Sequence, residues 1–172
     1  MNQWNTINNS STRFISAKAV GNAVHYTMAN GQTWVKEGGT KAWRHTNPGN
    51  MKSTTFTKRA GAIGTGVEET YYTNERGSHY AVFPDWDTGK RAIKTLLLSP
   101  SYRDKDIRGV VKRYAPTASG EVNKAYVNKL QVCTGESCRW KTVKDFSEKE
   151  LSDLIDGIID MEGYRSGKVY KL

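Results

Sequence analysis

The sequence predicts an α+β fold, mainly α, with one small region of β-structure near the middle of the chain. Apolar residues recur at helical spacing in the N-terminal and C-terminal parts, whereas residues 53–83 are rich in the β-branched and aromatic residues that favour strands. The chain has 172 residues, 37% of them hydrophobic and 25% charged, which suits one globular domain with a sizeable core. We expect a flexible leader over residues 1–12, rich in Asn, Ser and Thr, and a single domain over residues 13–172.

The N-terminal part of this domain is predicted to be helical. Over residues 13–28 apolar residues recur near helical spacing, although Gly21 and the pair Asn30–Gly31 interrupt the pattern. A second short helix is expected over residues 33–37. It would end at Gly38–Gly39, because glycine accepts the left-handed conformation that closes helices.

Residues 53–83 contain the expected β-structure. Thr54–Thr57 is strand-like, and a hairpin is predicted in which Thr70–Thr73 pairs with Ser78–Phe83 across the turn residues Asn74–Gly77. This region would form a small lobe beside the helices.

The remainder of the chain is predicted to be helical, with capping signals at the helix starts. Asp85 follows Pro84 and is interpreted as a cap of the next helix. Helices are expected from Asp87 or Thr88 to Leu98, from Asp106 to Tyr114, from Glu121 to Val132, and after the capping box Ser147–Glu150.

Composition limits the classes of partner. The net charge of +9 favours a polyanion, either nucleic acid or the acidic polymers of a bacterial cell wall, although charge that only confers solubility is the simpler interpretation. The basic residues are dispersed and no nucleic-acid motif occurs, so we expect no nucleic-acid partner. No run approaches the roughly 18 apolar residues of a membrane span. Residues 1–16 lack an apolar segment, so no signal peptide is expected.

The cysteines and histidines predict no cofactor or metal site. The two cysteines, Cys133 and Cys138, enclose a short loop and are predicted to form a disulfide in an oxidising compartment, with two free thiols as the alternative. The three histidines lie far apart in the sequence, without the paired spacing of a metal-binding helix.

The candidate catalytic residue is Glu37, which stands directly before Gly38–Gly39. On the last turn of a helix the dipole disfavours negative charge, so a carboxyl group there has a reason to retain its proton. The turn residues Asn47–Asn50 follow closely, as do the aromatic Trp43 and the hydrogen-bond donor His45. A solvated surface acid is the simpler interpretation of an arbitrary glutamate.

This stretch resembles a lysozyme-like family of phage cell-wall hydrolases and of muramidase domains in type VI secretion effectors. The resemblance covers roughly residues 33–130. Its motifs here are Glu37-Gly38-Gly39, Trp43-Arg44, Asn47-Pro48-Gly49-Asn50, Gly61-Ala62-Ile63-Gly64, Tyr80-Ala81-Val82-Phe83-Pro84-Asp85, Gly89-Lys90-Arg91-Ala92 and Arg113-Tyr114-Ala115-Pro116.

The resemblance implies a lysozyme-like fold with a small β-hairpin lobe. It also implies a monomeric muramidase that cleaves peptidoglycan, with Glu37 as the general acid. Such a protein would act in the periplasm or cell wall of target bacteria, delivered by a secretion system or a phage lysis route, and would have a cognate immunity protein as a partner.

The remaining site residues follow from the chemistry of such a site. A second carboxylate would activate water or stabilise the transition state, and of Glu68 and Glu69 we select Glu69. A lytic transglycosylase needs one acid only, and a non-catalytic glycan-binding module needs none, so both classes remain open. The candidate substrate-binding residues are Trp43, His45, Asn47, Asn50, Tyr80 and Tyr114.

Overall fold

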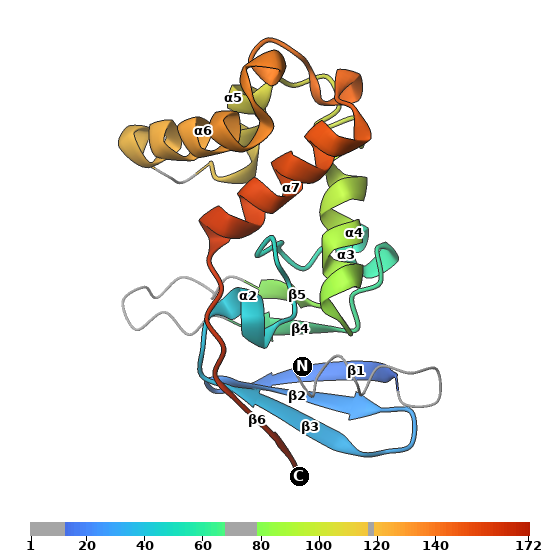
Figure 1. Ribbon diagram of the computed structural model, residues 1–172. Helices are drawn as coiled ribbons and strands as arrows, with labels where there is room; N and C mark the ends of the chain where they lie inside the picture. Colours follow the sequence, from blue (N-terminus) through green and yellow to red (C-terminus); the bar gives the residue numbers. More distant parts are fainter. Residues whose placement is uncertain (1–12, 68–78, 117–118) are drawn as a thin grey trace. The chain divides into compact units, whose positions relative to one another are not determined.

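The computed structural model describes residues 13–67, 79–116 and 119–172 (Figure 1). They fall into two compact units. The first combines the chain up to Ala92 with Gly163–Leu172, and the second is Ile93–Glu162. The leader expected over residues 1–12 lies outside the described residues, and the single domain expected from residue 13 onward stays a prediction.

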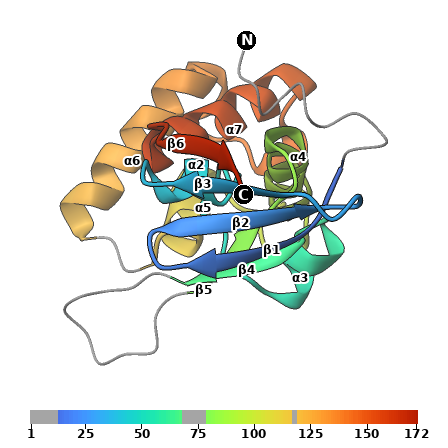
Figure 2. The same cartoon turned by 90° about the horizontal axis from the view of Figure 1, so that it is seen from below.

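A six-stranded mixed sheet forms the framework of the first unit. Its order is β5-β4-β1-β2-β3-β6, and neighbouring strands are antiparallel except for the parallel pair β1 and β4 (Figure 2). The fold is therefore α+β, but the mainly α, lysozyme-like fold with a small β-hairpin lobe that we expected is wrong. The strands are β1 (Phe14–Val20), β2 (Ala23–Met28), β3 (Thr33–Glu37), β4 (Gly64–Val67), β5 (His79–Val82) and β6 (Lys168–Lys171).

The segment predicted to be two N-terminal helices forms strands β1, β2 and β3. In β2 the buried residues Val24, Tyr26 and Met28 are spaced by two, which is the period of a strand with one buried face. Gly21, which we interpreted as a weak point of a helix, lies in the two-residue loop between β1 and β2 with a positive φ of 53°. The helical interpretation failed because a few apolar spacings in this segment fit both periods.

The sheet has two faces with different residues. The core on its inner face contains Phe14, Val24, Tyr26, Met28 and Val82, with Trp34 and Val169 packed against it. The opposite face, here called the outer face, carries the alternate residues of β1, β2, β3 and β6, and Figure 2 looks onto it with α2 (Lys41–Arg44) behind the strands. The outer-face residues are Ser16, Lys18, Val20, Ala23, His25, Thr27, Thr33, Val35, Glu37, Lys168 and Tyr170.

The β-structure expected within residues 53–83 is only partly where we placed it. β5 lies within the predicted strand Ser78–Phe83, but the segment paired with it is β4. The predicted strand Thr70–Thr73 lies outside the described residues. Thr54–Thr57 is not a strand: Thr54 caps α3 (Thr55–Arg59), with its side chain accepting a hydrogen bond from the Thr57 backbone N–H.

The predicted C-terminal helices are present. α4 (Trp86–Leu97) is capped by Asp85, whose Oδ1 accepts from the Thr88 backbone N–H at 2.7 Å, and α5 (Ile107–Tyr114) is capped by Asp106. The second unit also contains α6 (Gly120–Thr134), the 3₁₀ helices η1 (Glu136–Cys138) and η2 (Val143–Asp145), and α7 (Glu148–Glu162). The longest described helices have 15 residues, and none of them could cross a bilayer.

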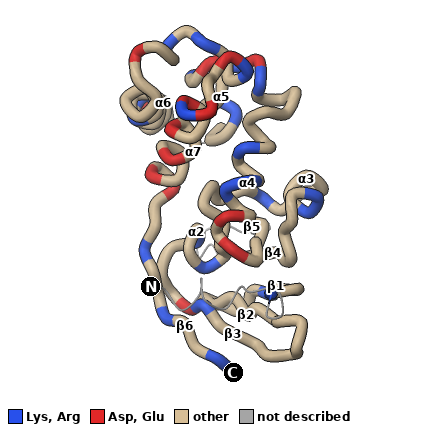
Figure 3. The backbone as a smooth tube through the Cα atoms, turned by 45° about the vertical axis from the view of Figure 1, so that its right-hand side comes forward, with Lys and Arg blue, Asp and Glu red and all other residues tan. Residues whose placement is uncertain are grey.

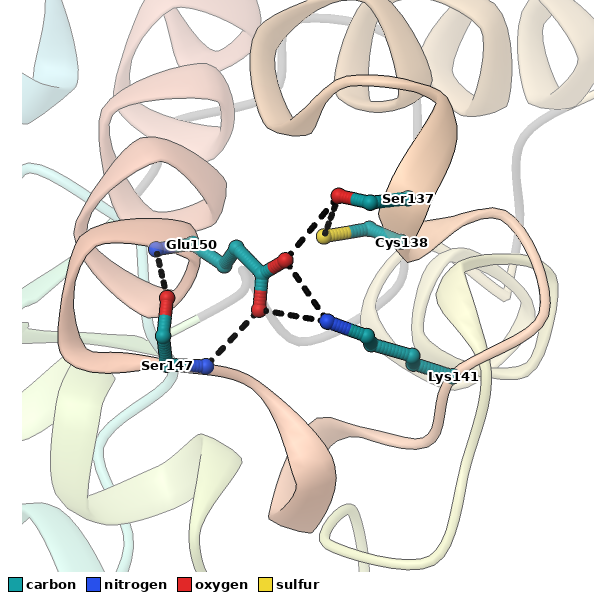
Figure 4. A network of polar contacts seen from close by, with 5 residues as sticks. All are labelled: Ser137, Cys138, Lys141, Ser147 and Glu150. Atoms are coloured by element: carbon teal, nitrogen blue, oxygen red, sulfur yellow. Dashed lines mark hydrogen bonds and ion pairs between the residues drawn. The ribbon is translucent and has the colours of Figure 1, made fainter.

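The predicted capping box at the start of α7 is confirmed (Figure 4). The Ser147 hydroxyl accepts from the Glu150 N–H at 3.2 Å, and the Glu150 carboxylate accepts from the Ser147 N–H at 2.8 Å. Lys141 and Ser137 also donate to this carboxylate. These donors, Lys141 first, lower the pKa of Glu150 to about 2.

Both Cys133 and Cys138 are free thiols in the structure, and the disulfide expected in an oxidising compartment stays a prediction. Cys133 packs beside Gly157 of α7, whereas the buried Cys138 lies beside Ser137, which donates to Glu150 at the start of α7. Gly157 and Glu150 are seven residues apart in α7, which is roughly 10 Å along the helix axis. A disulfide needs Cα atoms within roughly 7 Å, so the thiols would have to leave their present contacts to pair.

Candidate active site around Glu37

Glu37 is the last residue of β3 and its side chain is exposed. The predicted place on the last turn of a helix is therefore wrong, and the argument from the helix dipole does not apply. The preceding residue, Lys36, is buried and contacts the inner side of the sheet, so the alternation of a strand directs Glu37 to the outer face.

The turn after Glu37 is fixed by Arg44. Gly38 and Gly39 have positive φ values of 70° and 63°, a conformation that suits glycine. The Arg44 guanidinium donates from Nη1 to the carbonyl oxygens of both glycines, at 3.0 and 2.7 Å. The Gly38 N–H in turn donates to the Asn22 carbonyl at 3.0 Å. The backbone that leaves Glu37 is thus tied both to α2 and to the β1–β2 hairpin.

The C-terminal segment holds Glu37 from the other side. Lys168 is the partner of Glu37 in the register of β3 and β6, and a Cβ at Gly167 would overlap the Glu37 carbonyl oxygen. Thr40 and Arg165 exchange two hydrogen bonds, in which the Thr40 N–H donates to the Arg165 carbonyl and the Arg165 N–H donates to the Thr40 hydroxyl. Glu37 is therefore an exposed carboxylate on a closely held backbone.

Tyr170 of β6 is the aromatic residue next to Glu37 on the outer face. It is opposite Val35 in the register, which makes it a diagonal neighbour of Glu37 within reach of a long side chain. Partial burial raises the pKa of Tyr170, and the charge of the nearby Glu37 carboxylate raises it further. The two side chains are therefore neighbours on the outer face.

Lys36 lies in the core directly behind Glu37. Its Nζ donates to the Trp43 carbonyl at 3.1 Å and to the Thr46 hydroxyl at 3.2 Å, and it lies 5.0 Å from the centroid of the Trp43 ring. The Tyr26 hydroxyl completes this network by bonding to the Arg44 carbonyl at 2.5 Å and to the Thr46 hydroxyl at 2.8 Å. Burial lowers the pKa of Lys36 to about 7.

Trp43 and His45, which we expected to bind substrate, are buried, with 2% and 3% of their surface exposed. The His45 Nδ1 lies 3.0 Å from the Lys41 carbonyl, and a Cβ at Gly66 would overlap the His45 ring. The His45 carbonyl accepts from the Phe83 N–H at 3.0 Å. Both side chains therefore support the site from within the core.

The predicted turn at Asn47–Asn50 is confirmed by a hydrogen bond of 3.0 Å from the Asn50 N–H to the Asn47 carbonyl. Asn47 is fully buried and cannot contact a substrate. Its Nδ2 donates to the carbonyls of Met51 and Ala81 at 2.8 and 2.9 Å, and its Oδ1 accepts from the Met51 N–H at 3.0 Å. Asn47 thus fastens the turn to β5, while Asn50, with a φ of 44°, is partly exposed.

We expect Asn47→Ala to lower the free energy of unfolding by about 3 kcal/mol, because it removes three buried hydrogen bonds and leaves the Met51 N–H unsatisfied. Chemical denaturation followed by tryptophan fluorescence measures this. Asn30→Ala, at an exposed loop position, is the control and should change stability by less than about 1 kcal/mol. Equal stability of the two variants would refute the structural role of Asn47.

Tyr80 is the one predicted substrate-binding aromatic of the first unit that is partly exposed. Its ring stacks on His45 with a centroid distance of 6.1 Å, and its hydroxyl accepts from the Lys41 Nζ at 3.2 Å. Val67 of β4, which pairs with His79, is followed in the sequence by Glu68 and Glu69. The predicted second acid, Glu69, lies outside the described residues, as does Glu68.

Tyr114 belongs to the second unit. It is half-buried and makes an edge contact with Tyr102 at a centroid distance of 6.5 Å. Its pKa is raised by burial first, and then by the charge of Glu162. No group of three or more His, Cys, Asp and Glu side chains suited to a metal ion occurs among the described residues.

Sequence reasoning gave no role to Lys36 or Tyr170, and it noted Arg44 only as part of a motif. For Tyr170 the signal is the pair Val169–Tyr170, a β-branched and an aromatic residue of the types that favour strands. For Lys36 the signal is its spacing of two from Trp34, which places both on one face once β3 is recognised as a strand.

Comparison of the sequence with models of protein families gave no match, and comparison with curated proteins also gave none.

Proposed function

We propose that this protein is a peptidoglycan-cleaving glycoside hydrolase, a muramidase, in which Glu37 donates the proton to the leaving oxygen. The observation that carries the proposal is an exposed carboxylate on a backbone held by Arg44, Asn22 and β6. An acid catalyst must be accessible to the substrate and held in a fixed position. Here the contacts that hold the backbone are already present before a substrate binds. The sequence motifs that begin at Glu37 support the same assignment.

The second acid separates the two enzymatic alternatives. Among the described residues of the first unit the acids are Glu37, Asp85 and Asp87, and Asp85 is occupied as the cap of α4. This favours, as a second candidate, a lytic transglycosylase, which needs a single acid because a hydroxyl of the sugar attacks. A two-acid muramidase would take its second carboxylate from Glu68 or Glu69, which follow β4 in the sequence and lie outside the described residues.

In this proposal the protein is a monomer without a cofactor. It acts on the cell wall of target bacteria after delivery by a secretion system or a phage lysis route, and a cognate immunity protein restrains it. The motifs that resemble secretion effectors and phage hydrolases support this delivery.

Mass spectrometry of cell-wall fragments tests the proposal directly. Purified sacculi digested with the wild-type protein should release glycan fragments with reducing ends if the protein is a muramidase. Anhydro-sugar ends would identify a lytic transglycosylase. Intact sacculi after prolonged digestion would refute both enzymatic functions.

Binding to sacculi should weaken as the salt concentration rises, because the net charge of +9 favours the acidic wall polymers and salt screens exposed charges. Basic residues recur along α3, along α4 and in β6 (Figure 3). Co-sedimentation with sacculi from about 0.05 to 0.5 M NaCl measures the effect. A bound fraction that does not change with salt would show that the basic surface is not what holds the protein on the wall.

A further inference from the structure

The side chain of Glu37 fixes the side of the sheet from which a substrate can reach it. Lys36 faces the core and Glu37, the next residue of the strand, faces outward. The motif residues Trp43, His45 and Asn47 are buried on the inner side. A glycan protonated by Glu37 must therefore lie on the outer face, away from the motif side chains that we first expected to bind it.

The strand register places two rows of residues on the outer face around Glu37. One row runs across the sheet as Val20, Ala23, Glu37 and Lys168. The neighbouring row runs as Lys18, His25, Val35 and Tyr170, and of these Val35 is fully buried and cannot contact a ligand. Glu37 thus has Lys168 of β6 opposite it and Tyr170 of β6 and His25 of β2 as diagonal neighbours, while Lys18 of β1 lies one strand beyond His25.

We propose that the exposed and partly exposed side chains of these two rows of the outer face form the binding surface for the glycan strand, with Tyr170 as the residue on which a sugar ring beside Glu37 stacks. This inference rests on the proposed function, because it takes Glu37 as the proton donor. Tyr170 is 40% exposed and is the diagonal neighbour of Glu37 in the strand register, so its ring is available to a ligand beside Glu37.

The chemistry of the two rows suits a strand of alternating N-acetylglucosamine and N-acetylmuramic acid. An aromatic ring offers an apolar surface to the C–H face of a sugar, while its polar edge keeps a hydrogen bond. The exposed Lys18 and Lys168 are cations at the two ends of the rows, which suits the carboxylates of muramic acid and its peptide. His25, between Lys18 and Val35 in its row, adds a group that can bond to a sugar hydroxyl or amide.

The test is a titration of the Glu37→Gln protein with a soluble tetrasaccharide of alternating N-acetylglucosamine and N-acetylmuramic acid. Backbone amide shifts measured by NMR locate the ligand, and Glu37→Gln prevents cleavage during the experiment. Tyr170→Ala and Tyr170→Phe are made in the same background. Trp140→Ala is the control, because Trp140 is an aromatic residue with 80% of its surface exposed that belongs to the second unit.

We expect the largest shifts in the two rows of β1, β2, β3 and β6, and an affinity about tenfold lower in Tyr170→Ala. Tyr170→Phe should bind nearly as the parent does, because the ring is kept, and Trp140→Ala should not change the affinity. Shifts confined to β4, β5 and the Asn50 turn, an unchanged affinity in Tyr170→Ala, or no binding at millimolar ligand would overturn the inference.

The outcomes separate this inference from the proposed function. If the wild-type protein cleaves sacculi but the tetrasaccharide maps to β4 and β5, the enzymatic function is supported and the proposed binding surface is refuted. If the tetrasaccharide maps to the two rows but the wild-type protein cleaves no sacculi, the binding surface is supported and the enzymatic function is refuted. The protein is then a glycan-binding module.

Discussion

Glu37→Gln should abolish glycan cleavage while the protein remains folded and still binds sacculi. Glutamine keeps the shape of the side chain and removes the transferable proton. General acid catalysis contributes roughly two to four orders of magnitude, so the remaining rate should be at least about a hundredfold lower. The side chain is exposed, so the change should cost less than about 1 kcal/mol of stability. Turbidity clearing and the release of soluble fragments measure the rate.

Asp87→Asn is the matched control for Glu37→Gln. Asp87 is an exposed acid of the first unit, in the first turn of α4, and its replacement should leave the rate unchanged. Glu68→Gln and Glu69→Gln, made singly, locate the second acid: loss of activity at one of them, with reducing ends among the products, identifies a two-acid muramidase. Full clearing of sacculi by Glu37→Gln would refute Glu37 as the acid.

Lys36 should make the stability of the protein depend on pH. Its pKa is about 7 in the folded protein and about 10.5 when unfolded, so between these values the unfolded state binds more protons. The free energy of unfolding therefore rises with pH across this window, by up to about 1.4 kcal/mol per pH unit. Below pH 7 the ammonium is charged in both states, and the cost of burying it is then largest.

Lys36→Met removes this dependence. From pH 7 to about pH 9.5 the wild-type protein should gain about 3 kcal/mol over the variant, as measured by urea denaturation at each pH. The pH range of this measurement ends at about 9.5 because of Tyr26. Burial raises the pKa of Tyr26 in the folded protein, so above about pH 10 this residue ionises only in the unfolded state, which lowers the stability of both proteins. Lys58→Met, at an exposed position of α3, is the control and should follow the wild type. Parallel curves for Lys36→Met and the wild type would refute the lowered pKa of Lys36 in the folded protein.

The helices could be predicted because their signals are local. The capping box Ser147–Glu150 and the caps Asp85 and Asp106 each bond a backbone N–H within three residues. A sequence shows such signals directly, since a side chain three residues away is always within reach of the helix start. The helix after each of them is where we expected it.

The sheet could not be predicted because its pairings are distant. β3 pairs with β6, and β1 pairs with β4 in parallel. In both cases the two strands are far apart in the sequence, and the residues between them do not indicate which strands pair. The turn at Asn47–Asn50 could be predicted from its residue types, but the burial of Asn47 in the core could not. A buried Asn47 and an exposed Asn47 look the same in a sequence, and burial decides whether such an amide binds a ligand or fastens a turn.

The pairing of β3 with β6 can form only late in the synthesis of the chain. Glu37 leaves the ribosome long before Lys168, and until Lys168–Lys171 emerge, its strand has an open edge with unpaired backbone groups. At 5–20 residues per second the delay is on the order of ten seconds. In that interval neither Lys168 nor Tyr170 is beside Glu37, so the surroundings of Glu37 on the sheet are complete only after Lys168–Lys171 have been synthesised.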